Sequence, residues 1–134
     1  MKTGLLAIST VLALGVAALP MLAHHSFAAE YDSTKPLTLK GAVTKLEWTN
    51  PHARFFIDVK DEQGATANWE FELGSPNGLM RRGWTRNSLK VGDSVVVEGY
   101  RAKDGSKLVN ARQVTLADGR KIFAGSSDDG GPTK

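Results

Sequence analysis

Apolar and polar residues alternate over most of the chain beyond residue 36. A period of two is typical of β-strands, whose side chains point to opposite faces in turn. The clearest alternation places these apolar residues on one face: Ala65, Ala67, Trp69, Phe71 and Leu73. The residues between them are polar, so the pattern predicts a strand with one face in the core and the other in water.

The first predicted strand contains a change of parity. One parity is shared by Leu37, Leu39 and Val43, and the other by Leu46 and Trp48. A parity change within one strand predicts a β-bulge, here near Thr44 or Lys45. Such a bulge lets a long strand bend from one sheet into the next.

The remaining strands are separated by turn sequences rich in glycine and aspartate. They are predicted at Phe55–Val59, Ala65–Leu73, Ser94–Arg101, Lys107–Leu116 and Ile122–Phe123. Ser75 and Pro76 open a short helix that ends at Arg82, before Gly83. Three strands, a helix and two or three further strands follow the order of the OB-fold. We therefore predict a mainly β protein, a small five- or six-stranded antiparallel OB-like barrel with one short helix, over residues 37–125.

Residues 1–23 have the plan of a signal peptide, with Lys2, an apolar run over Leu5–Ala18 and the helix breaker Pro20. Cleavage after Ala23 is favoured over cleavage after Ala28, because the second site leaves a long polar stretch behind the apolar run. The sequence thus predicts a periplasmic or secreted protein without stable membrane insertion once the signal is removed. The alternative is an uncleaved anchor, although small and polar residues dilute the apolar run.

The two ends of the mature chain are predicted to be irregular. Residues 24–36 read as an extended N-terminal segment, and residues 126–134 as a disordered tail without large apolar side chains. The chain contains no cysteine, so no disulfide supports the fold. A formal charge of +3 is weak evidence for a polyanionic partner, and we expect no nucleic-acid binding.

Short motifs are spread from His24 to Ser127. They are His24-His25-Ser26-Phe27-Ala28-Ala29-Glu30-Tyr31-Asp32, Asn50-Pro51-His52, Gly74-Ser75-Pro76-Asn77, Arg82-Gly83-Trp84-Thr85-Arg86, Ala102-Lys103-Asp104-Gly105-Ser106 and Phe123-Ala124-Gly125-Ser126-Ser127. Together they resemble an uncharacterised family of small exported bacterial proteins, domain of unknown function 6152. The resemblance implies export and a compact β domain, and it transfers no activity, cofactor or catalytic residue.

His24, His25 and His52 are the candidate metal ligands. Cleavage after Ala23 would make His24 the first residue, and its free α-amine and imidazole could then chelate one metal ion. Nitrogen donors of this kind suit copper(II), with nickel and zinc weaker. His52 follows a turn sequence between the first two strands, which places it at a barrel mouth. The alternative is that His24 and His25 are solvated and that His52 hydrogen-bonds a turn carbonyl.

A second class of function is a metal-free ligand or protein interaction module. Phe56 lies opposite in parity to its apolar neighbours, which predicts an exposed aromatic ring beside Asp58, with Trp48 at the end of the preceding strand. Barrels of this class bind ligands across their second and third strands. Trp84 is predicted to plug the bottom of the barrel, and the alternative is an anion-binding surface with the surrounding arginines.

Little in the sequence favours an enzyme. Glu70 and Glu72 share one face of a strand, as paired catalytic carboxylates can, but Arg54 or Lys60 on the neighbouring strand could neutralise them. We therefore expect a non-enzymatic binding protein. Its partner would be a small ligand, a metal such as copper, or another exported protein.

Overall fold

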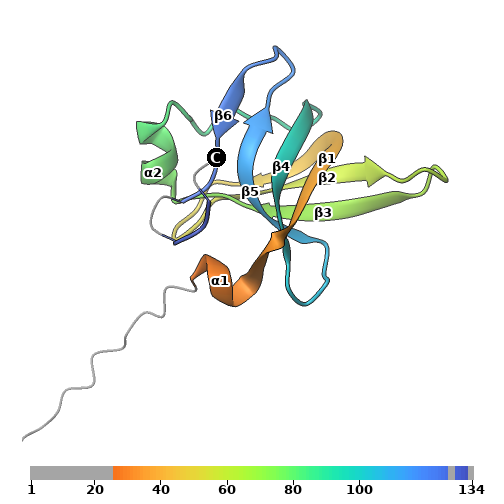
Figure 1. Cartoon of the computed structure of the whole chain (residues 1–134). Helices are drawn as coiled ribbons and strands as arrows, with labels where there is room; N and C mark the ends of the chain where they lie inside the picture. Colours follow the sequence, from red (N-terminus) through yellow and green to blue (C-terminus); the bar gives the residue numbers. More distant parts are fainter. Residues whose placement is uncertain (1–25, 127–128, 133–134) are drawn as a thin grey trace, which may run out of the picture.

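The computed structural model describes residues 26–126 and 129–132 and shows a mainly β protein (Figure 1). The strands of this part of the chain are β1 (Tyr31–Glu47), β2 (Arg54–Lys60), β3 (Thr66–Glu72), β4 (Ser94–Ala102), β5 (Leu108–Thr115) and β6 (Lys121–Phe123). The helices in it are α1 (Phe27–Glu30) and α2 (Pro76–Arg81). The predicted mainly β fold class is confirmed.

Five of these strands form a barrel-like ring. The sheet runs in the order β3-β2-β1-β4-β5-β6, and an additional β3–β5 pairing closes the first five of these strands into the ring. This closing pair is parallel, with Phe71 opposite Val109, whereas all the other pairs are antiparallel. The prediction was of antiparallel pairs alone. The difference follows from the odd number of strands in the ring: when the other four neighbouring pairs of a five-stranded ring are antiparallel, the strand directions alternate and the closing pair must be parallel.

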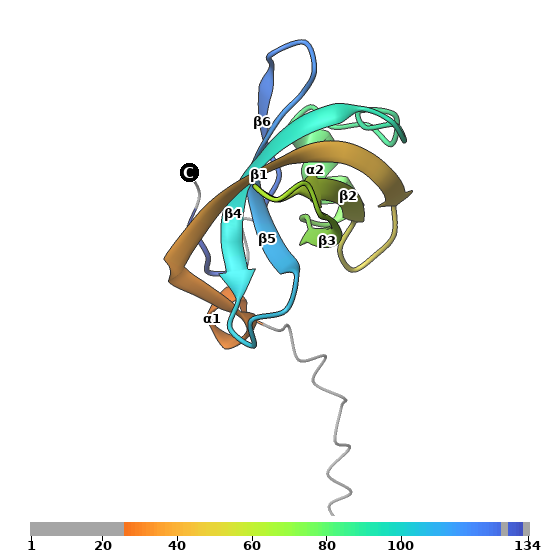
Figure 2. The ribbon, with the colours of Figure 1, turned by 90° about the vertical axis from the view of Figure 1, so that its right-hand side faces the viewer.

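β1 is shared between the two halves of the ring. Its residues from Tyr31 to Ala42 pair with β4, and those from Ala42 to Glu47 pair with β2. The register against β2 shifts between Val43 and Lys45, which confirms the predicted bulge near Thr44. The bend lets one strand belong to both halves, and Figure 2 shows β1 curving over from β4 toward β2.

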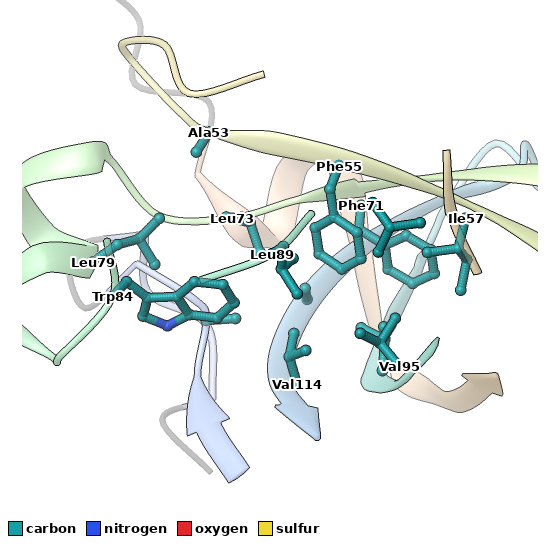
Figure 3. Packing of buried hydrophobic residues seen from close by; sticks show 14 of the residues in the cluster. Ala53, Phe55, Ile57, Phe71, Leu73, Leu79, Trp84, Leu89, Val95 and Val114 are labelled. Carbon is teal, nitrogen blue, oxygen red and sulfur yellow. The ribbon is translucent and has the colours of Figure 1, made fainter. Parts of the chain in front are cut away.

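Trp84 closes the end of the ring beside α2. Its side chain is only 2% exposed, and the indole Nε1 donates a hydrogen bond to the Phe123 carbonyl at 2.9 Å. Figure 3 shows the ring of Trp84 lying next to Leu79 of α2, at one end of a cluster that continues to Phe55 and Phe71. Trp84 is therefore the predicted plug.

The short helix α2 begins after its predicted cap at Ser75 and ends at Arg81, one residue before the predicted end at Arg82. The Ser75 side chain accepts a hydrogen bond from the Gly78 amide at 3.2 Å, and Pro76 occupies the first turn. This is the usual serine N-cap, which satisfies an amide that the helix itself leaves unpaired. The helix lies across the end of the ring and carries the chain toward Trp84.

The N-terminal segment is more ordered than its sequence suggested. β1 begins at Tyr31, six residues before the predicted strand at Leu37, and the single turn α1 precedes it. The buried residues Phe27, Tyr31 and Ala102 form a second apolar cluster outside the ring, against which Tyr100 packs. The predicted signal peptide lies outside the described residues. Within the described ranges, no helix is long and apolar enough to cross a membrane.

Candidate functional site

His52 lies in the loop between β1 and β2, with 27% of its side chain exposed. Its Nδ1 is 2.9 Å from the carbonyl oxygen of Leu73. Because a carbonyl oxygen only accepts, Nδ1 carries the proton and the lone pair of the neutral ring resides on Nε2. An imidazole held through Nδ1–H by a carbonyl is also the usual outer-shell arrangement of metal-binding histidines.

Glu72, the last residue of β3, lies beside this imidazole. Its Oε1 is 3.9 Å from Nδ1 of His52, and its Oε2 accepts a hydrogen bond from the Tyr31 hydroxyl at 3.0 Å. We call these three residues the His52–Glu72 corner. Tyr31 belongs to the N-terminal end of β1, so the corner connects the start of the described chain with the loop that carries His52.

Arg54 contacts the two glutamates of β3 unequally. Its Nη1 contacts Oε1 of Glu70 at 2.6 Å, while its Nη2 remains 3.9 Å from Oε2 of Glu72. The expected cross-strand neutralisation by Arg54 is therefore present, mainly toward Glu70. Only 14% of the Glu72 side chain is exposed, so the two glutamates occupy different environments although they share a strand face.

Burial raises the pKa of Glu72 above its ordinary value of 4.5, and the nearby His52 and the Tyr31 hydrogen bond oppose this rise. Burial and the neighbouring Glu72 carboxylate also raise the pKa of the Tyr31 phenol. Tyr31 therefore stays protonated and acts as the donor. The Glu72 carboxylate is held by the Tyr31 hydroxyl and lies near the imidazole. It can therefore orient His52 and place a negative charge beside it.

The raised pKa of Glu72 predicts a specific dependence of stability on pH. The folded protein binds the proton of Glu72 more tightly than the unfolded chain does, so this contribution is fully present below pH 4.5 and is lost as the pH rises through the folded pKa. Glu72→Gln keeps an acceptor for Tyr31 but cannot ionise. The free energy of unfolding of both proteins is measured with urea from about pH 4 to about pH 7. The value for Glu72→Gln should increase relative to that of the parent as the pH rises. Parallel curves would contradict this assignment.

His24 and His25 lie outside the described residues, which begin one residue later at Ser26. Four of the six residues from Ser26 to Tyr31 form the single turn of α1, which rises only about 6 Å. Tyr31, five residues after Ser26, donates to Glu72, so the N-terminal end of β1 lies at the His52–Glu72 corner. Within the described ranges themselves, no group of three or more potential ligands from His, Cys, Asp and Glu is present.

The aromatic candidate residues divide between two locations. Phe56 is half-buried on the outer side of β2, and the Lys45 ammonium lies 5.2 Å from its ring centroid. Asp58 is exposed on the same face and accepts a hydrogen bond from Asn68 Nδ2 at 2.8 Å. Trp48 instead packs against the main core. The structure thus brings Phe56 and Asp58 together but directs Trp48 elsewhere.

The fold and the corner define a small β-ring protein with a half-buried histidine and a half-buried carboxylate beside its N-terminal arm, residues 26–31. A model described as "Family of unknown function (DUF6152)" matches residues 11–110, and the chain belongs to this family. No match was found among curated proteins. The family is defined without an activity, so function must be argued from the residues.

Proposed function

We propose that the protein is an exported, non-enzymatic binding protein that takes up copper(II), or another divalent metal, through an N-terminal histidine together with His52. The orientation of His52 is the main support. Its Nδ1 is engaged by the Leu73 carbonyl, so its other nitrogen, Nε2, is the one with a free lone pair. Tyr31, from the N-terminal arm, holds the neighbouring Glu72 in place.

Packing of Phe27 supports a cut after Ala23 rather than after Ala28. Phe27 is only 4% exposed, stacks on Tyr31 with 5.7 Å between ring centroids, and meets the Tyr100 ring edge-on at 5.5 Å. Cleavage after Ala28 would remove this aromatic ring from its cluster. Cleavage after Ala23 keeps Phe27 and makes His24 the first residue of the mature chain.

The proposed donor set is rich in nitrogen. A first-residue His24 offers its α-amine and its imidazole to the same ion, and His25 and His52 add further imidazoles. Copper(II) binds such donors more tightly than zinc or nickel does, and it favours a tetragonal arrangement. The Glu72 carboxylate near Nδ1 of His52 would act from the outer shell, by making the imidazole a stronger donor.

The proposal predicts that copper binding depends on His52 and on the first residue. Tag-free protein beginning at His24 is titrated with copper(II) at neutral pH, with affinity measured against a competing chelator. His52→Ala should weaken binding about tenfold or more, which is about 1.4 kcal/mol. His52→Asn keeps a donor for the Leu73 carbonyl and lacks the ring nitrogen, so it should show the same loss with less effect on stability.

Extension of the amino terminus gives the matched test. One methionine before His24 separates the amine from the first imidazole, and His25→Ala must accompany it to prevent a new chelate at the third position. This variant should lose about tenfold or more relative to His25→Ala alone. If a variant without histidines binds copper as tightly as the parent, the metal proposal is wrong. The interaction module on the outer face of β2, at Phe56 and Asp58, then becomes the better account.

Processing is tested separately. The intact mass of protein recovered after native export should correspond to a chain that starts at His24. A chain starting at Ala29 would remove both histidines and the proposed site with them. Recovery of the full-length chain only in membranes would contradict export as a soluble protein.

A further inference from the structure

A buried arginine lies on the outer side of the ring and is not one of the residues of the His52–Glu72 corner. Arg112 of β5 stands where the register with β4 shifts, between the Gln113–Glu98 and Ala111–Gly99 pairs. A bulge of this kind redirects a side chain. Arg112 is only 2% exposed although its guanidinium is permanently charged, so the structure must supply a counter-charge.

The counter-charge comes from the C-terminal tail. Both carboxylate oxygens of Asp129 lie 3.1 Å from Nη2 of Arg112, and the carbonyl of Ser126 accepts a bond from Nη1 at 3.3 Å. The Asp129 side chain is only 9% exposed. This is a buried, charge-assisted contact, which is far more dependent on its geometry than a surface ion pair.

The same tail residues also hold the N-terminal arm. The Phe27 amide donates to the main-chain carbonyl of Asp129 at 2.8 Å, and the Phe27 ring lies 4.8 Å from the Arg112 guanidinium carbon. Phe27 is therefore bound to the tail through its backbone and to β5 through its ring. We call the contact of Phe27, Arg112 and residues 129–131 the terminal clasp.

The terminal clasp requires glycine where the C-terminal tail passes the Arg112 guanidinium. A Cβ atom added to Gly131 would lie within 1.6 Å of Nη2 of Arg112 and 2.7 Å from the Phe27 ring. Gly130 has a φ of +75°, in the region that disfavours side chains. The amide of Gly131 also donates to Oδ1 of Asp129 at 2.8 Å. Charge, backbone bonding and lack of space together specify an Asp-Gly-Gly segment.

We propose that Phe27 and Arg112 form a recognition site for an aspartate–glycine–glycine segment, that residues 129–131 fill it as an intramolecular ligand, and that filling it fixes the N-terminal arm. The ligand class is a short acidic, glycine-rich peptide. An equivalent segment of another chain would compete with the tail for the same site. The proposal uses no metal and does not rest on the proposed function, although Phe27 stacks on Tyr31 of the His52–Glu72 corner.

Hydrogen exchange of the Phe27 amide tests the proposal in the full chain, because this amide donates to Asp129. Asp129→Asn and Gly131→Ala should each accelerate its exchange about tenfold or more. Asp118→Asn removes an exposed carboxylate from a surface turn, and it should leave Phe27 unchanged. The indole Nε1–H of Trp84 reports on the ring itself and should exchange at the parent rate in every variant.

A peptide supplied in trans tests whether the site is separable from the tail. Added at about 1–10 mM, the range of effective concentration for a tethered segment, the peptide Ser-Ser-Asp-Asp-Gly-Gly-Pro should restore Phe27 protection in the full-length Asp129→Asn, Gly131→Ala double variant. The same peptide with Asn in place of the second Asp should not restore it.

Three results would overturn the proposal. Phe27 exchange that is unchanged by Asp129→Asn would show that the tail does not fix the arm. Equal acceleration of Trp84 and Phe27 would show that the clasp is part of the global fold and not a separable site. Failure of the acidic peptide to restore protection would show that the segment is not recognised as a ligand.

Discussion

Replacing Trp84 with alanine should lower the free energy of unfolding by about 3–5 kcal/mol, as truncation of a buried large aromatic usually does. The side chain is 2% exposed and fills the end of the ring beside Leu79. Its removal also leaves the Phe123 carbonyl without the indole donor at 2.9 Å. Urea unfolding followed by far-ultraviolet circular dichroism measures this loss without relying on the missing fluorophore.

Two further variants separate cavity formation from the lost hydrogen bond. Trp84→Phe keeps an aromatic ring but cannot donate to Phe123, so its loss should lie well below that of Trp84→Ala. Met80→Ala, at a side chain that is 50% exposed, should stay within about 0.5 kcal/mol of the parent. A loss below about 1 kcal/mol for Trp84→Ala would show that the end of the ring is not closed by this residue.

Gly41→Ala should destabilise the protein by about 3 kcal/mol or more, at the upper end of what overpacking costs. A Cβ at Gly41 would lie 2.0 Å from the carbonyl oxygen of Asp58. That oxygen belongs to the backbone of β2, so no side-chain rotation can relieve the clash. The contact occurs where β1 passes from β4 to β2, and a shift there would disturb both pairings.

Gly119→Ala is the matched control for Gly41→Ala. Gly119 has a φ of +85°, and a Cβ there would meet nothing within 4 Å. Its substitution therefore has only the conformational cost of a side chain at positive φ, about 1–2 kcal/mol. Thermal and urea unfolding of both variants should show a clearly larger loss for Gly41→Ala. Equal losses would mean that the ring can widen locally at the β1 crossing.

Local patterns were enough to predict the strands and the bend in the first of them. The parity change around Thr44 depends only on neighbouring residues, and the bulge is found there. The same holds for the cap at Ser75, whose hydrogen bond spans three residues. These features follow from short-range periodicity and backbone chemistry, which a sequence displays directly.

Features that depend on distant residues could not be read in the same way. Alternation predicts Trp69 in the core. In the structure its indole is half-buried at the margin of the main core cluster, and the Arg101 guanidinium lies 5.3 Å from the indole. The parity of Glu72 suggested a solvated side chain, and nothing local indicated that Tyr31, 41 residues earlier, covers it. In each case, burial depends on how remote segments close over the strand.

The C-terminal tail shows the same limitation. Its composition predicts disorder because it contains no large apolar residue. In the structure, Asp129 is nevertheless bound to Arg112 and Phe27, and Gly131 packs against both. One specific charge contact positions these residues, and composition does not record such a contact.

The parallel closing pair has a consequence for the order in which the chain can fold. β1, β2 and β3 are consecutive antiparallel neighbours and can associate through short connections, whereas the β3–β5 seam joins Glu70 to Leu108. Until β5 arrives, the outer edge of β3 presents unpaired amides and carbonyls to any other extended chain. Partly folded chains therefore expose an unpaired, aggregation-prone edge of β3, which is paired with β5 in the complete ring. The interval before closure is when aggregation competes most strongly with folding.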